Sequence, residues 1–179
     1  MNFWVFRIRL TMDKLSMISG ALFLAADIFA VTSLAMPHWI VSEIGGDTNI
    51  GLLKTCLTIY GRPSICFVPD PVRGEWLLTF VCIVLGVLCI NVTIFLLAFS
   101  YWQCRVIKLA RWLGFLAMIL FCLAAVIFPI GFDMDQIGGE AYQLPNNFRV
   151  GISYIFFVLA LWITVVSQLF ASKVCLPHF

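Results

Sequence analysis

Four long runs of apolar residues, separated by polar segments, dominate the pattern of this chain. The runs cover residues 15–36, 76–99, 112–131 and 150–171. Each is long enough to cross the roughly 30 Å of a bilayer's hydrocarbon as an α-helix, which takes about 20 apolar residues. Apolar residues fall on every face of each run, which is typical of membrane spans and not of surface helices. The pattern therefore predicts an all-α membrane protein, a bundle of four transmembrane helices.

These runs and their connections predict one domain with two short ends. The tetraspan domain covers residues 15–171, and its two large loops are residues 37–75 and 132–149. Residues 1–14 precede the domain and residues 172–179 follow it as a tail. The composition agrees, because 63% of the residues are hydrophobic and only 11% are charged. A soluble domain carries about 25% charged residues, so a soluble globule is excluded.

The distribution of basic residues predicts the orientation of the bundle. Lysine and arginine concentrate in the N-terminal segment, the connection between the second and third runs, and the tail, whereas the two large loops are acidic on balance. By the positive-inside rule, both termini lie in the cytosol and the two large loops lie outside. Residues 1–11 fit either a short interfacial anchor or an extension upstream of a start at Met12, and we favour the extension.

Two of the seven cysteines, Cys56 and Cys66, fall in the first outer loop, where oxidation is permitted. A single disulfide between them is the economical pairing, with two unpaired thiols as the alternative. Cys104 and Cys175 lie close to the membrane on the cytosolic side and are candidate palmitoylation sites. No metal site is expected, because Cys56 and Cys66 have no histidine pair nearby, and His38 and His178 lie on opposite sides of the membrane.

Asp27, Asn91 and Gln168 are the most polar residues well inside the apolar runs. A carboxylate at the centre of a membrane helix costs about 2.5–3.5 kcal/mol on insertion scales, so Asp27 is expected to have a partner or to be protonated. The candidates for that partner are Ser33, Asn91, Thr93, Thr164, Ser167 and Gln168. Such a group indicates a contact site for another membrane protein, a proton- or ion-sensing group, or a buried hydrogen bond that fixes the helix register. We favour the last interpretation.

Catalytic patterns are nearly absent from the chain. It shows no serine–histidine–aspartate arrangement, no paired-carboxylate pocket and no phosphate-binding loop. We therefore expect a protein that is not an enzyme and that needs no cofactor. Its expected partners are the lipid bilayer and other membrane proteins, not nucleic acid or a small-molecule substrate.

The first loop carries a spaced signature: Trp39, then Gly51-Leu52-Leu53, then Cys56 and Cys66. It resembles the signature of the claudin and peripheral myelin protein superfamily of tetraspan proteins. The resemblance implies a claudin-like four-helix bundle with a small extracellular antiparallel β-sheet formed by the first loop. Claudins usually have tryptophan at the position of Leu53 and commonly end in a valine, whereas this chain ends in Phe179.

A closer resemblance extends over nearly the whole chain from Met12 onward. It is carried by residues 12–15, 23–30, 110–112, 118–122, 127–132, 144–147 and 173–177. These stretches are similar to the modulator of smoothened (Atthog) family. The resemblance implies a regulator at the plasma membrane and primary cilium that attenuates Hedgehog signalling. It would lower the amount of the receptor smoothened through a membrane-tethered ubiquitin ligase assembly. A junctional barrier protein and an auxiliary subunit of an ion channel are the alternatives.

Overall fold

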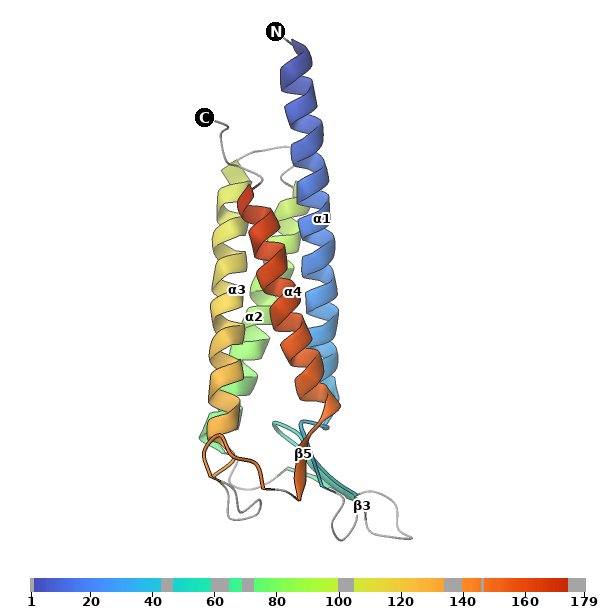
Figure 1. Cartoon of the computed structure of the whole chain (residues 1–179), viewed down its shortest axis with the longest axis vertical. Coiled ribbons are helices and arrows are strands. Elements are labelled where there is room, and N and C mark those ends of the chain that lie inside the picture. The colour runs from blue at the N-terminus through green and yellow to red at the C-terminus, as the bar shows by residue number, and fades with distance from the viewer. Residues whose placement is uncertain are drawn as a thin grey trace.

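The computed structural model describes residues 2–42, 47–58, 65–68, 73–99, 105–133, 140–145 and 147–173. Its helices are α1 (Asn2–Ala35), α2 (Gly74–Phe99), α3 (Arg105–Ile130) and α4 (Ile152–Lys173). The helices run in alternating directions, so α1 begins and α4 ends at the same end of the bundle (Figure 1). A small β-sheet lies at the other end, which we call the sheet end.

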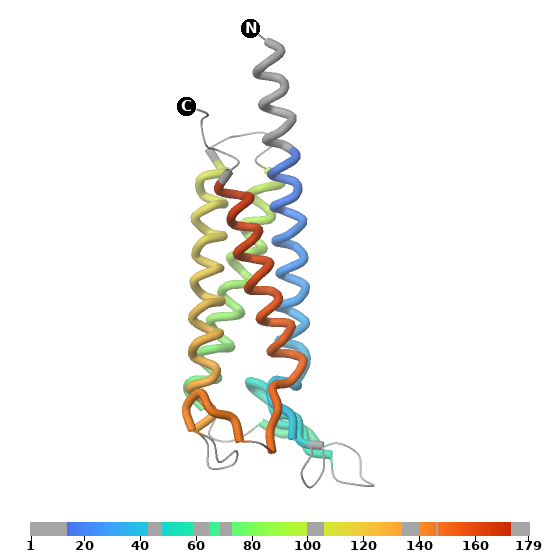
Figure 2. The backbone as a smooth tube through the Cα atoms, in the orientation of Figure 1, coloured from blue at the N-terminus to red at the C-terminus, as the bar shows by residue number. Residues whose placement is uncertain are grey.

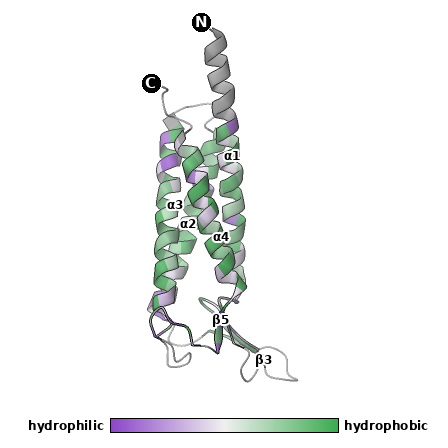
Figure 3. Cartoon of the chain, viewed as in Figure 1, coloured by the Kyte–Doolittle hydropathy of each residue, from purple (hydrophilic) through white to green (hydrophobic). Residues whose placement is uncertain are grey.

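Within the described residues, each of these helices contains a stretch that is long and apolar enough to cross a membrane. The stretches are Lys14–Ala35, Gly74–Phe99, Val106–Ile130 and Ile152–Ser172. Hydrophobic residues cover most of the helix surfaces along the bundle (Figure 3). The prediction of a four-helix membrane bundle is confirmed.

Several helix boundaries differ from the ends of the apolar runs. Helix α1 begins at Asn2 instead of residue 15, and α3 begins at Arg105 instead of residue 112. A helix continues outside the hydrocarbon wherever its backbone hydrogen bonds persist, whereas an apolar run ends at the first charged residue. Helix α4 begins at Ile152 instead of residue 150, because the preceding residues form a β-strand.

The bundle consists of two closely packed helix pairs. Helix α1 packs mainly on α4, and α2 packs mainly on α3, while the α1–α2 and α3–α4 seams are more lightly packed. Gly86 of α2 permits one close approach, because a Cβ there would collide with the ring of Phe121 on α3. The path of the chain through the bundle can be followed in Figure 2.

In the described part of the chain, five short antiparallel strands form one sheet at the sheet end. They are β1 (Ile40–Ser42), β2 (Asp47–Ile50), β3 (Thr55–Thr58), β4 (Ile65–Phe67) and β5 (Phe148–Val150). Their spatial order is β4-β3-β2-β1-β5. The predicted antiparallel sheet is confirmed, and β1 through β4 come from the first loop as expected.

Strand β5 corrects the expectation that the first loop alone forms the sheet. It comes from the second loop and pairs with β1, with Val41 opposite Arg149. Without β5, strand β1 would leave one row of backbone donors and acceptors unpaired. The second loop therefore covers that edge and connects the sheet directly to α4.

Candidate functional site

Trp39, the first residue of the signature, lies where α1 leads into β1. Its side chain is only 1% exposed. The ring lies edge-on to Phe128 of α3, with 4.9 Å between ring centres, and close to Tyr154 and Phe157 of α4. The indole Nε1 donates a hydrogen bond of 3.0 Å to the carbonyl of Ser33 in α1. Trp39 therefore joins α1, α3 and α4 at the sheet end.

The start of α4 is hydrogen-bonded to the residues that follow α1. Ser153 Oγ donates to the carbonyl of Met36 at 2.9 Å and accepts from the backbone N–H of His38 at 3.3 Å. The N–H of Gly151 donates to the carbonyl of Trp39 at 2.8 Å. A Cβ at Gly151 would collide with the His38 carbonyl. These contacts fix the sheet to the α1–α4 pair.

The other signature residues also have packing roles. The N–H of Gly51 donates to the carbonyl of Lys54 at 2.8 Å, and a Cβ at Gly51 would lie 2.9 Å from Cα of Pro37. The Leu52 side chain is buried in the core. Gly51 and Leu52 therefore allow the turn between β2 and β3 to pack against the end of α1.

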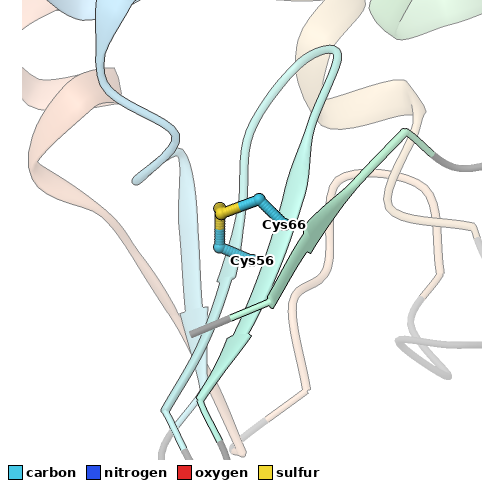
Figure 4. The surroundings of a disulfide bond; sticks show 2 residues. All are labelled: Cys56 and Cys66. Atoms are coloured by element: carbon cyan, nitrogen blue, oxygen red, sulfur yellow. A yellow bond between two sulfur atoms is a disulfide. The ribbon is translucent and has the colours of Figure 1, made fainter. Parts of the chain in front are cut away.

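Cys56 and Cys66 form the predicted disulfide. They lie directly opposite each other on β3 and β4, with 4.0 Å between their Cα atoms and 2.01 Å between their sulfurs (Figure 4). Strand β4 is an edge strand whose side chains are exposed. The disulfide therefore holds a strand that has little packing of its own.

Two buried serines join α1 to α4 deep in the bundle. Ser19 Oγ donates to the carbonyl of Ser167 at 3.1 Å, and Ser167 Oγ donates to the carbonyl of Ser19 at 2.9 Å. Both side chains are fully buried. We did not identify this pair from the sequence. Small polar residues in two apolar runs are a signal for helix contacts, but they do not reveal which residues meet.

Gln168, one of the predicted intramembrane polar residues, does not contact Asp27. It lies between α4 and α3, where its Nε2 donates to the carbonyl of Arg111 at 2.8 Å. Its Oε1 has no hydrogen-bond partner among the described residues, and it faces Gly114. Gln168 therefore connects α3 and α4 across the second lightly packed seam of the bundle.

Asp27 and Asn91 do form a pair, across the seam between α1 and α2. Asn91 Nδ2 donates to Asp27 Oδ1 at 3.0 Å and to the carbonyl of Val87 at 2.9 Å. The Asn91 side chain is exposed and that of Asp27 is partly exposed, so the pair faces the surroundings of the bundle and not its core. The pair thus differs from the buried register-fixing hydrogen bond that we favoured from the sequence.

The predicted palmitoylation sites, Cys104 and Cys175, lie outside the described residues. Three cysteines within the described residues are free: Cys82, Cys89 and Cys122. Palmitoylation of Cys104 and Cys175 stays a prediction.

A family model described as Atthog, Attenuator of Hedgehog, matches residues 36–177. This match covers well over half of the chain. The chain belongs to the Attenuator of Hedgehog family. Membership confirms the closer resemblance and implies a role in attenuating the Hedgehog pathway.

The matched residues of this Attenuator of Hedgehog protein begin where α1 ends. They include the whole signature, the five strands described above, and helices α2, α3 and α4. Asn91 lies within the match, whereas Asp27 precedes it on α1. The Asp27–Asn91 pair therefore combines one residue of the matched region with one residue of the first helix.

Proposed function

We propose that this protein attenuates Hedgehog signalling by lowering the amount of smoothened at the cell surface and primary cilium. It would be a multi-pass protein of the plasma membrane with both termini in the cytosol. There it would associate with a membrane-tethered ubiquitin ligase assembly. The family match over residues 36–177 is the observation that supports the proposal most directly.

In this proposal the protein binds its partners and does not catalyse a reaction. Another subunit would carry out ubiquitin transfer, and this chain would hold its partners together in the membrane. Two features of the structure support an adaptor role. The sheet is fixed to the bundle through Trp39 and Ser153, and so offers a rigid outer surface. The α1–α2 seam offers a polar contact within the membrane.

Deletion of the gene in Hedgehog-responsive cells tests the proposal. Surface biotinylation should show more smoothened after deletion, and a Hedgehog transcription reporter should respond to lower ligand doses. Re-expression of the chain should reverse both changes, except when ubiquitin activation is inhibited. If the protein were instead a junctional barrier protein or an ion-channel subunit, the amount of smoothened at the surface should not change.

Two results would contradict the proposal in different ways. A changed reporter with unchanged surface smoothened would place the attenuation at another step of the pathway. A re-expressed chain that lowers smoothened equally well under the ubiquitin-activation inhibitor would remove the ligase assembly from the mechanism. Protease protection of epitope tags at the two ends tests the orientation separately, and cleavage from outside would overturn it.

A further inference from the structure

The Asp27–Asn91 pair is more exposed than most of the uncharged polar side chains of the membrane spans. Most of those side chains are buried inside the bundle. They are Ser19, Ser33, Thr79, Thr93, Ser153, Thr164, Ser167 and Gln168. Asn91, by contrast, is exposed on α2, and Asp27 is only partly covered. The bundle therefore presents a carboxylate and an amide to its surroundings.

The pair lies well inside the membrane spans. About 12 Å of helix separates Asp27 from Ala35, and the same length separates Asn91 from Phe99, at about 1.5 Å per residue. The opposite ends of these two spans are farther away. Hydrocarbon offers no hydrogen bonds, so polar groups at this depth are costly unless protein covers them.

Two oxygen atoms of the pair accept no hydrogen bond from the described residues. The amide nitrogen of Asn91 is occupied by Asp27 Oδ1 and the Val87 carbonyl. In the described part of the chain, neither Asp27 Oδ2 nor Asn91 Oδ1 has a hydrogen-bond partner. The site therefore presents two oxygen atoms, and an ionised Asp27 adds a negative charge that a positively charged donor would compensate.

The surroundings of the pair suit a helix as the source of that donor. The α1–α2 seam is one of the two lightly packed seams. Exposed apolar side chains flank the pair on both helices: Leu24 and Ile28 on α1, and Leu88 and Val92 on α2. Apolar flanks around one polar centre match a membrane helix with a single polar residue.

We propose that the α1–α2 seam binds a transmembrane helix of another protein that carries a lysine or arginine near the middle of its span. The basic side chain would donate hydrogen bonds to Asp27 Oδ2 and Asn91 Oδ1 and neutralise the carboxylate. A serine or threonine could satisfy one oxygen but would leave the charge uncompensated. The inference rests on the proposed function only in that the chain acts by associating with other membrane proteins.

A second copy of this chain does not provide the required group. Within the described membrane spans, the basic residues are Lys14, Lys108 and Arg111, which all lie near span ends. None of them reaches the depth of Asp27 along a neighbouring helix packed in the same membrane. The occupant is therefore a different protein.

Binding of a defined probe helix to the full-length chain in phosphatidylcholine vesicles tests this inference. The probe is a fluorescent oligoleucine single-span peptide with one central lysine, and energy transfer to the labelled chain reports association. Matched probes carry leucine at the centre, or move the lysine toward one end. We expect association with the central-lysine probe and much weaker association with the other two.

Variants of the chain locate the contact. Asp27→Leu and Asn91→Leu should each weaken binding of the central-lysine probe by about 5- to 30-fold, the range typical of polar contacts between membrane helices. Leu123→Ala, at an exposed position on α3, is the matched control and should bind normally. The Asp27→Lys variant should no longer bind the central-lysine probe but should bind a probe with a central aspartate, because the charges of the two partners are exchanged.

Several outcomes would overturn the inference. Equal binding of the leucine and lysine probes, or undiminished binding by a folded Asp27→Leu variant, would exclude a charge contact. Energy transfer between two copies of the chain that depends on Asp27 would make a second copy the occupant. Size-exclusion chromatography and formation of the Cys56–Cys66 disulfide check that each variant folds. The assay contains no smoothened, so its failure leaves the proposed function to be judged by the cellular experiment.

Discussion

Replacement of Trp39 by alanine tests whether the signature residue stabilises the fold. The side chain is almost fully buried and contacts the rings of Phe128, Tyr154 and Phe157. Its indole N–H also binds the carbonyl of Ser33, one of the last carbonyls of α1, which lack partners within the helix. Alanine would remove all of these contacts at once.

The expected cost follows from these contacts. Truncation of a buried tryptophan to alanine typically costs about 3–5 kcal/mol, mainly through the cavity that remains. Trp39→Phe keeps an aromatic ring but loses the donor to Ser33. A buried carbonyl left without its partner costs about 1–3 kcal/mol, so Trp39→Phe should lie between wild type and Trp39→Ala.

The assay is denaturant titration of the purified protein in mild detergent, followed by far-ultraviolet circular dichroism so that loss of a tryptophan does not alter the signal. Trp162→Ala is the matched control, because Trp162 is 66% exposed on α4. That variant should lose less than about 1 kcal/mol. If Trp39→Ala were no more destabilising than Trp162→Ala, the contacts of Trp39 would not stabilise the bundle.

Four further substitutions test other contacts. Ser167→Ala removes the hydrogen bond from Ser167 Oγ to the Ser19 carbonyl but keeps the one that Ser19 Oγ donates to the backbone carbonyl of residue 167, and it should lower the free energy of unfolding by about 0.6–2 kcal/mol. Gly86→Leu forces a side chain into the facing ring of α3 and should cost about 1–3 kcal/mol in the same titration. Cys66→Ser opens the disulfide, which should cost about 2–4 kcal/mol and make β4 sensitive to protease. Asp27→Leu removes a carboxylate from the membrane, so it should raise insertion efficiency in a translocon assay. A change of opposite sign in any of these measurements would contradict the contact concerned.

The four membrane spans could be predicted from the sequence because the thickness of the bilayer sets their length. An apolar run of about 20 residues is rarely anything other than a transmembrane helix. Their ends could not, because a helix such as α3 extends past the hydrocarbon to Arg105. Strand β5 could not be predicted from the sequence either. It has three residues, and its conformation depends on pairing with β1, which lies more than a hundred residues earlier in the chain.

The candidate site could be predicted only in part, because a sequence identifies polar residues but not which face of a bundle they occupy. Asp27, Asn91 and Gln168 were all recognised as unusual, and Asn91 was among the candidate partners of Asp27. The relative rotation of α1, α2 and α4 decides that Asn91 meets Asp27 while Gln168 meets Arg111. That rotation follows from side-chain packing along the α1–α4 and α2–α3 pairs.

The signature and the polar pair are therefore expected to respond to substitution in opposite directions. Trp39, Gly51 and Leu52 are buried at the sheet end, so changes there should lower stability and affect function only through folding. The Asp27 side chain is partly exposed at a lightly packed seam, where its removal should make insertion easier. A substitution that improves insertion, leaves the free energy of unfolding unchanged and still abolishes lowering of smoothened does not act through misfolding. Under the proposed function, Asp27→Leu is the variant that separates recognition of a partner from stability of the bundle.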